Sequence, residues 1–75
     1  MAQKMSNAPI WDEIAGRWKE LKGNVRMQWG KLTDDDLEQI KGSREVLAGR
    51  LQQRYGWAKE EANRQIDEWA KRLKF

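Results

Sequence analysis

The sequence predicts an all-α domain. Three observations support this fold class: apolar residues recur at steps of three and four, glycines and capping residues separate these segments, and no useful run alternates with a period of two. A chain of 75 residues forms one small domain, close to the size at which a single core only just suffices. We expect residues 1–8 to be a flexible tail and residues 9–75 to form a single four-helix domain.

The first predicted helix begins near Pro9, with Ser6 or Asn7 as its cap. Glycines 16 and 23 each weaken it by up to ~1 kcal/mol relative to alanine, which indicates either the close approach of another backbone or a bend. Gly30 stands where a helix is commonly closed by a left-handed residue. One continuous inner face steps by 4, 3, 4, 4 and 3 through Ile14, Trp18, Leu21, Val25, Trp29 and Leu32.

The segment that follows is the turn around which the chain is organised. Thr33 can accept hydrogen bonds from the backbone N–H groups of the next turn, and Asp34–Asp36 place negative charge at the positive end of a helix. Residues 37–41 form the rest of this short second helix, and Gly42 closes it. The pattern therefore predicts a sharp corner between the first helix and the second.

Two further helices complete the domain. Ser43 is expected to cap the third helix, Gly56 to close it, and the fourth to begin near Ala58. Basic residues at the end of the fourth helix suit the negative end of the helix dipole. The predicted core comprises Trp18, Leu21, Val25, Trp29, Leu37, Ile40, Leu47, Leu51, Tyr55, Ile66 and Trp69.

A shift of 26 residues indicates an internal repeat without gaps. It aligns glycines with glycines, apolar residues with apolar residues, and the acidic start of one helix with that of another. We interpret it as two helix–turn–helix hairpins, each with an aromatic–glycine corner, that must pack on one another. The aligned positions include Gly16, Leu21, Gly23, Trp29 and Gly30 with Gly42, Leu47, Gly49, Tyr55 and Gly56.

The run from Trp18 to Gly23, followed by Gln28 to Asp36, resembles the CsbD-like family of small bacterial proteins, and the segments 49–52 and 54–56 fit the same pattern. The resemblance covers roughly Ile14 to Trp69. It implies a compact four-helix domain of two hairpins packed crosswise, in a SAM-domain-like bundle, and a bacterial protein associated with general stress. It brings no catalytic residues.

Composition excludes several classes of function. The chain has no cysteine and no histidine, so disulfides, thiolate metal sites and histidine-based catalysis are absent. No apolar run resembles a signal sequence or reaches the ~20 residues of a membrane span. Charge is nearly balanced, with 15 basic and 12 acidic residues. We expect a cytoplasmic protein without cofactors, monomeric or weakly self-associating.

Two charged clusters invite functional interpretations. Clustered carboxylates such as Asp34–Asp36 suit calcium or magnesium, but the glycine and distal glutamate of an EF-hand are missing, so helix capping is favoured. Lys19, Lys22 and Arg26 form a basic stripe on the first helix that could follow a phosphate backbone. An ordinary solvated face is the favoured interpretation, because the net charge is modest and Trp18 belongs to the apolar face.

The fourth helix could lie on an anionic membrane, because it has an apolar side together with basic residues at its end. Core packing is favoured, since so small a domain needs that apolar side. Only Phe75 has no obvious core role. The residues concerned are Ile66, Trp69, Leu73 and Phe75, with Lys71, Arg72 and Lys74.

Catalysis is the least favoured function, because we find no glycine-rich phosphate loop and no nucleophile beside a plausible base. Two hypotheses remain. The first is a non-enzymatic, soluble stress-response protein that protects other macromolecules. The second is a small binding module that holds nucleic acid or a protein partner through Lys19, Lys22 and Arg26.

Overall fold

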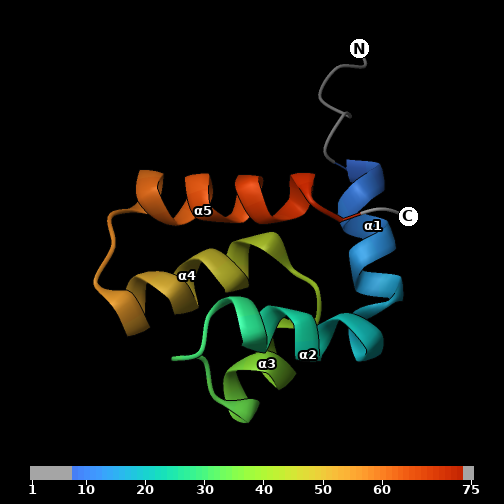
Figure 1. The fold of residues 1–75 in the computed structure, drawn as a ribbon, viewed down its shortest axis with the longest axis horizontal. Helices are drawn as coiled ribbons and strands as arrows, with labels where there is room; N and C mark the ends of the chain where they lie inside the picture. Colours follow the sequence, from blue (N-terminus) through green and yellow to red (C-terminus); the bar gives the residue numbers. More distant parts are fainter. Residues whose placement is uncertain (1–7, 74–75) are drawn as a thin grey trace.

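The computed structural model describes residues 8–73, with the side chains of residues 8 and 9 left aside (Figure 1). Five α-helices and no strand occur in this range. The all-α prediction is therefore confirmed, whereas the expected tail and the cap at Ser6 or Asn7 fall mostly outside the described residues. The helices are α1 (Ala8–Gly16), α2 (Trp18–Gln28), α3 (Asp34–Ile40), α4 (Arg44–Tyr55) and α5 (Lys59–Lys71).

Helices α4 and α5 lie side by side as a hairpin, and α2 and α3 pack below them in the view of Figure 1. Helix α1 runs across the end of this assembly, where α4 begins and α5 ends. The ring of Trp11 on α1 lies 6.3 Å from that of Trp69 on α5, and the Arg44 guanidinium of α4 lies over Trp11 at 5.9 Å. Helix α1 thus closes one end of the core.

The prediction of one continuous first helix is wrong. Arg17 leaves the helical region (φ −112°, ψ 21°) and separates α1 from α2, so the domain has five helices instead of four. Gly16, the last residue of α1, is a weak helix former. The break gives α1 its own direction while Ile14 and Trp18, on either side of it, both remain buried in the common core.

Two of the three predicted glycine closures agree with the structure. Gly42 and Gly56 have positive φ (80° and 72°), although Lys41 is the residue that caps α3, itself left-handed at φ 47°. Gly30 does not have positive φ. Trp29 leaves the helical region itself (φ −128°, ψ 88°), so α2 ends without a left-handed residue.

The predicted helix starts agree well with the structure. The Thr33 hydroxyl accepts from the backbone N–H of Asp36, and the Ser43 hydroxyl accepts from that of Val46. Helix α5 begins directly after Ala58, as expected, but its N-cap makes no side-chain hydrogen bond. Local capping side chains therefore determine where α3 and α4 begin.

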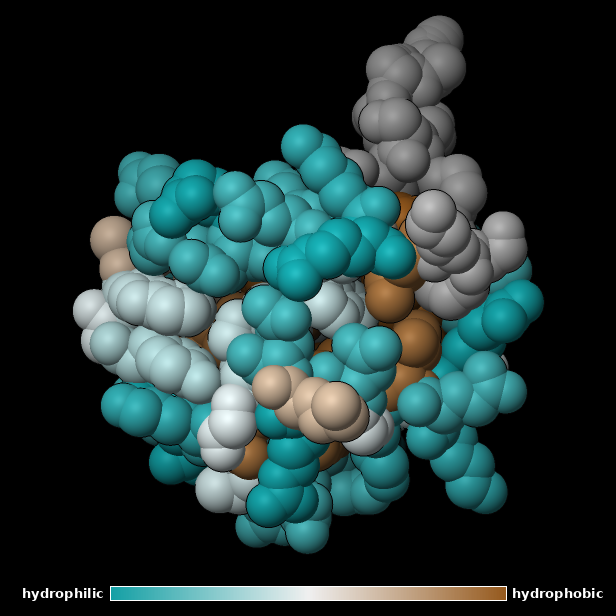
Figure 2. All heavy atoms as spheres, viewed as in Figure 1, coloured by the Kyte–Doolittle hydropathy of each residue, from teal (hydrophilic) through white to brown (hydrophobic). Residues whose placement is uncertain are grey.

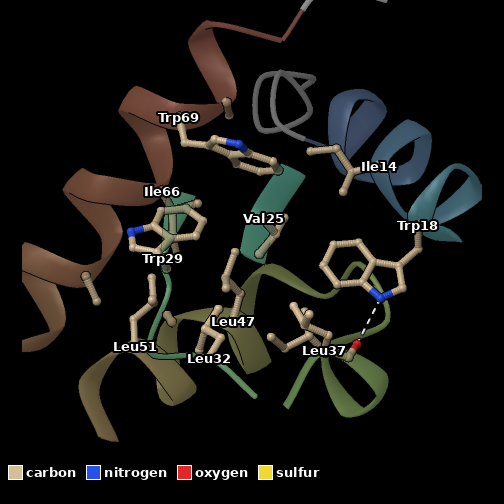
Figure 3. Close-up of a cluster of buried hydrophobic side chains, with 14 residues drawn as sticks. Ile14, Trp18, Val25, Trp29, Leu32, Leu37, Leu47, Leu51, Ile66 and Trp69 are labelled. Atoms are coloured by element: carbon tan, nitrogen blue, oxygen red, sulfur yellow. Dashed lines mark hydrogen bonds between the residues drawn. The ribbon is translucent and has the colours of Figure 1, made fainter. Parts of the chain in front are cut away.

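One core unites all five helices (Figure 3). Nine of the eleven predicted core residues are buried, and the other two, Leu21 and Tyr55, pack against the core while partly exposed. Leu32 is buried although it follows the end of α2, so its predicted position on a helical face was wrong. The core also includes Ile14, Leu32, Ala48, Ala62 and Ala70.

The glycines serve different purposes. A side chain at Gly42 would place its Cβ 2.5 Å from the Cα of Ala15, so α1 packs directly on the turn between α3 and α4. At Gly16 and Gly23 an added Cβ would meet nothing within 4 Å. The close approach of another backbone in this chain is therefore not the reason for either of these two glycines.

Candidate functional site

The predicted basic stripe lies on α2, and two of its three cations form ion pairs with α3. The Lys22 ammonium lies 2.8 Å from the Glu38 carboxylate, and this hydrogen bond lowers the pKa of Glu38. Arg26 pairs with Asp34. Lys19 is exposed and forms no ion pair with another described residue. The stripe is therefore not a row of free cations, because Lys22 and Arg26 bridge two helices.

The three consecutive aspartates have different surroundings. Asp34 pairs with Arg26, Asp35 is exposed, and Asp36 is buried with only 2% of its surface exposed. Carboxylates that point to different partners do not converge on one cation. Among residues 8–73 no group of three metal-ligating side chains is close enough to hold a metal ion.

Asp36 is the centre of a polar cluster that joins α3 to α4. It completes a capping box with Thr33, whose backbone N–H donates to Asp36 Oδ2 at 2.9 Å. Arg54 donates to both carboxylate oxygens, from Nε at 2.8 Å and from Nη2 at 3.0 Å, and Arg50 Nε lies 3.8 Å away. We call Asp36 and Arg54 the clamp.

The clamp keeps Asp36 ionised. Its pKa falls from 3.8 to about 2, chiefly because Arg54 hydrogen-bonds to the carboxylate, and the backbone N–H of Thr33 adds to the effect. Burial opposes this shift, but the bidentate hydrogen bonds outweigh it. Sequence reasoning placed Asp36 at the capped, acidic start of a helix and also weighed it as a metal ligand, but it missed Arg54. The only sequence signal was the Thr-x-x-Asp spacing, which indicates the cap but not its arginine partner.

A second contact lies beside the clamp. The backbone N–H of Lys31 donates to the Tyr55 hydroxyl at 3.3 Å, and the Lys31 ammonium lies 5.2 Å from the centre of the Tyr55 ring. Trp57 stacks on Tyr55 with ring centres 4.5 Å apart. The turn after α2 and the turn after α4 therefore meet at one end of the molecule.

The tryptophans of α2 and its C-cap are buried, as expected, and cannot stack on a nucleic-acid base. The Trp18 indole N–H donates to the carbonyl of Leu37 at 2.9 Å, which is the dashed line in Figure 3. Trp29 packs against Trp69 with ring centres 5.6 Å apart. The Trp69 indole N–H in turn donates to the Asn24 side chain at 2.9 Å.

The inner face of α5 packs in the core, which agrees with the favoured interpretation of that helix. Ile66 and Trp69 are buried, Leu73 is half-buried, and Lys71 and Arg72 are exposed. Lys74 and Phe75 lie outside the described residues. None of the described helices is both long and apolar enough to cross a bilayer.

A hollow lies between α4 and α5. It is an open groove of about 620 Å³, and no side chain in it is a nucleophile paired with a base. Its lining residues are Ser43, Arg44, Glu45, Ala48, Gly49, Gln52, Lys59 and Asn63.

Comparison with known sequences decides the family. The profile of the CsbD-like family matches residues 12–64. This chain belongs to the CsbD-like family. The UPF0337 protein YjbJ of Escherichia coli O6:H1 is 52% identical to it over 61 residues, which are 81% of this chain and 88% of that protein.

A second relative lies outside the enteric bacteria. The UPF0337 protein RPA4217 of Rhodopseudomonas palustris is 52% identical over 64 residues, or 85% of this chain and 97% of that protein. The match to the CsbD-like profile includes the basic stripe, the clamp and the whole groove. It ends within α5, so the basic end of that helix lies outside it.

Proposed function

We propose that this CsbD-like protein is a soluble, cytoplasmic, non-enzymatic component of a general stress response that protects other macromolecules. Membership of the CsbD-like family carries the proposal. The outer surface supports it, because charged and polar side chains cover most of the face seen in Figure 2. A hydrophilic shell of this kind keeps a small protein soluble at high concentration.

The distribution of charge is consistent with such a role. Many of the surface cations form ion pairs within the chain, including Arg44 with Asp67 at 2.7 Å and Arg64 with both Glu61 and Glu68. A surface of mixed and largely paired charge attracts no single class of polyelectrolyte strongly. This pattern suits a molecule that surrounds many macromolecules better than one that selects a single anionic partner.

The test is a protection assay. A labile enzyme is dried or heated with the folded protein, with a destabilised Trp29→Ala variant, and with an equal mass of an unrelated small protein. The proposal predicts that more enzyme activity survives with the folded protein than with either control. Equal survival in all three mixtures would contradict the protective role.

The alternative is a module that binds nucleic acid through Lys19, Lys22 and Arg26. The ion pairs of Lys22 and Arg26 weaken this hypothesis, since each would have to be broken to contact a phosphate. Binding of labelled single-stranded DNA at low salt tests it by fluorescence anisotropy. If this alternative is correct, binding weakens steeply with salt and Lys19→Gln weakens it further.

A further inference from the structure

Two surface features have no evident role in the packing of this chain. Met27 on α2 is 86% exposed, more than any other large hydrophobic residue that the structure describes. The groove between α4 and α5 is open to solvent, and the small residues Ala48 and Gly49 are among those that line it. A single exposed methionine is ordinary. Here, however, the same molecule has both an exposed apolar side chain and an open groove that could receive one.

Met27 belongs to a row that faces away from the core. Glu20, Gly23 and Met27 are exposed and spaced by three and four residues, so they share one side of α2, opposite the buried Val25. We call these three residues the outer ridge. Glycine at position 23 destabilises the helix by up to ~1 kcal/mol relative to alanine. A Cβ there would meet nothing within 4 Å, so no contact among the described residues requires a glycine at this position.

The groove has a matching glycine. Gly49 lies within α4 beside Ala48, and a Cβ at Gly49 would also meet nothing within 4 Å. Together the two small residues leave room for the close approach of a helix. Lys59, at the start of α5, lines the end of the groove near the α4–α5 turn, and Glu45, in the first turn of α4, lines the other.

We propose that the outer ridge of one copy docks in the groove of a second copy. Met27 lies over Ala48 and Gly49, and Gly23 allows the backbones of α2 and α4 to come close. Glu20, seven residues from Met27, is directed toward Lys59. Neither Glu20 nor Lys59 forms an ion pair with another described residue, so the two charges are available to complement each other.

The two sides of this contact are different surfaces. A contact of this kind leaves one ridge and one groove vacant in every dimer, so association continues head to tail instead of stopping at two copies. The buried patch is small and partly polar, so the association is weak and depends on concentration. The proposal stands independently of the protective function, which needs no self-association.

The first test is sedimentation velocity of the full chain from micromolar to millimolar concentration. The mean mass of the native protein is expected to rise with concentration, and Met27→Glu weakens this association by about tenfold or more. Val46→Glu is the matched control, because Val46 is also an exposed hydrophobic residue but belongs to neither surface. A native protein that remains monomeric throughout, or equal effects of the two substitutions, would overturn the proposal.

The second test uses complementation. A Cβ at Gly49 or at Gly30 meets nothing within 4 Å. Gly49→Leu places its side chain in the groove and should abolish association, whereas Gly30→Leu, outside the groove, should not. A mixture of the Met27→Glu and Gly49→Leu variants retains one intact ridge and one intact groove. It is expected to form a 1:1 dimer that does not grow. A mixture that stays monomeric, or association that survives Gly49→Leu, would refute this arrangement and point to another occupant of the groove.

Discussion

The turn at Trp29–Gly30 and the turn at Tyr55–Gly56 have the same sequence pattern and different structures. In the second turn Gly56 adopts the left-handed conformation, and its N–H donates to the carbonyl of Gln52 at 2.9 Å. In the first turn Gly30 has no positive φ, and Trp29 itself ends the helix. An aromatic–glycine pair therefore does not determine how a helix ends.

Burial explains the difference. Trp29 lies in the core against Trp69, whereas Tyr55 is half-buried and reaches Lys31 with its hydroxyl. The backbone of the first turn follows the position that the buried indole requires. The second turn has no such requirement and closes in the usual glycine conformation.

The two turns also differ in how the next helix begins. Helix α3 starts with the Thr33–Asp36 capping box, and Arg54 from the last helical turn of α4 holds it in place. Helix α5 starts at Ala58 with no side-chain cap. The start of α3 is thus stabilised by α4, whereas α5 has no such support. The predictions that follow test this difference from the largest expected effect to the smallest.

Truncating the two aromatic residues should have unequal effects. Trp29→Ala is expected to cost about 3–5 kcal/mol of unfolding free energy, because it leaves a large cavity in the core. Tyr55→Ala should cost clearly less, since that ring is only half-buried. Urea unfolding monitored by circular dichroism measures both. Equal losses would show that the turns do not differ in burial as described.

Acid should weaken the clamp at the start of α3. The folded pKa of Asp36 lies below its unfolded value, so its contribution is present above about pH 4 and is lost as the pH falls toward 2. The shift from 3.8 to about 2 corresponds to about 2 kcal/mol. Urea unfolding is measured from about pH 6, above both pKa values, down to about pH 2, near the folded pKa. Over this range Asp36→Asn should lose less unfolding free energy than the native chain. An equal loss of unfolding free energy in both chains would show that Asp36 is not the group whose protonation weakens the fold.

Alanine substitutions at Gly30 and Gly56 test directly the difference in backbone conformation between the two turns. Gly56→Ala should destabilise the fold by about 1 kcal/mol, because alanine is strained in the left-handed region. Gly30→Ala should change the free energy of unfolding by a few tenths of a kcal/mol at most. The backbone at position 30 does not have the positive φ that favours glycine, and the alanine Cβ would meet nothing within 4 Å. Thermal unfolding of the two variants provides the comparison. A larger loss at Gly30 would reverse the account of the turns.

The helix after the second turn can be stabilised by adding an N-cap, whereas the helix after the first turn already has one. Ala58 has the extended conformation of an N-cap (φ −70°, ψ 163°) but no oxygen with which to cap. Ala58→Ser should therefore stabilise the domain by about 0.5–1 kcal/mol. Thr33→Ser, which retains a hydroxyl at the cap, is the matched control and should gain nothing comparable. If Ala58→Ser did not raise the free energy of unfolding, the backbone N–H groups at the start of α5 would not need a side-chain cap.

Much of the fold followed from the sequence because its signals are local. The spacing of Leu47 and Leu51, and the hydroxyls of Thr33 and Ser43, act within one or two turns of helix. The break at Arg17 was missed, since the apolar spacing continues through it and only the packing of α1 on Gly42 gives it a purpose. The internal repeat stays a prediction.

The candidate sites were harder to predict for a physical reason. The stripe was correctly placed on one helix, but its ion pairs join Lys22 to a residue 16 positions away and Arg26 to one eight positions away. The clamp joins residues 18 positions apart, and no periodicity connects them. Such contacts depend on how helices meet, which the sequence pattern of a single helix does not contain.

The most direct test of the account is a double-mutant cycle on the clamp. Asp36→Asn, Arg54→Gln and the double variant are compared with the native chain by urea unfolding at neutral pH. If the clamp holds the start of α3 against α4, the losses of unfolding free energy in the two single variants are not additive, and the coupling is about 1–3 kcal/mol. Losses that add within about 0.3–0.5 kcal/mol would show that the two side chains act independently, which would contradict the account.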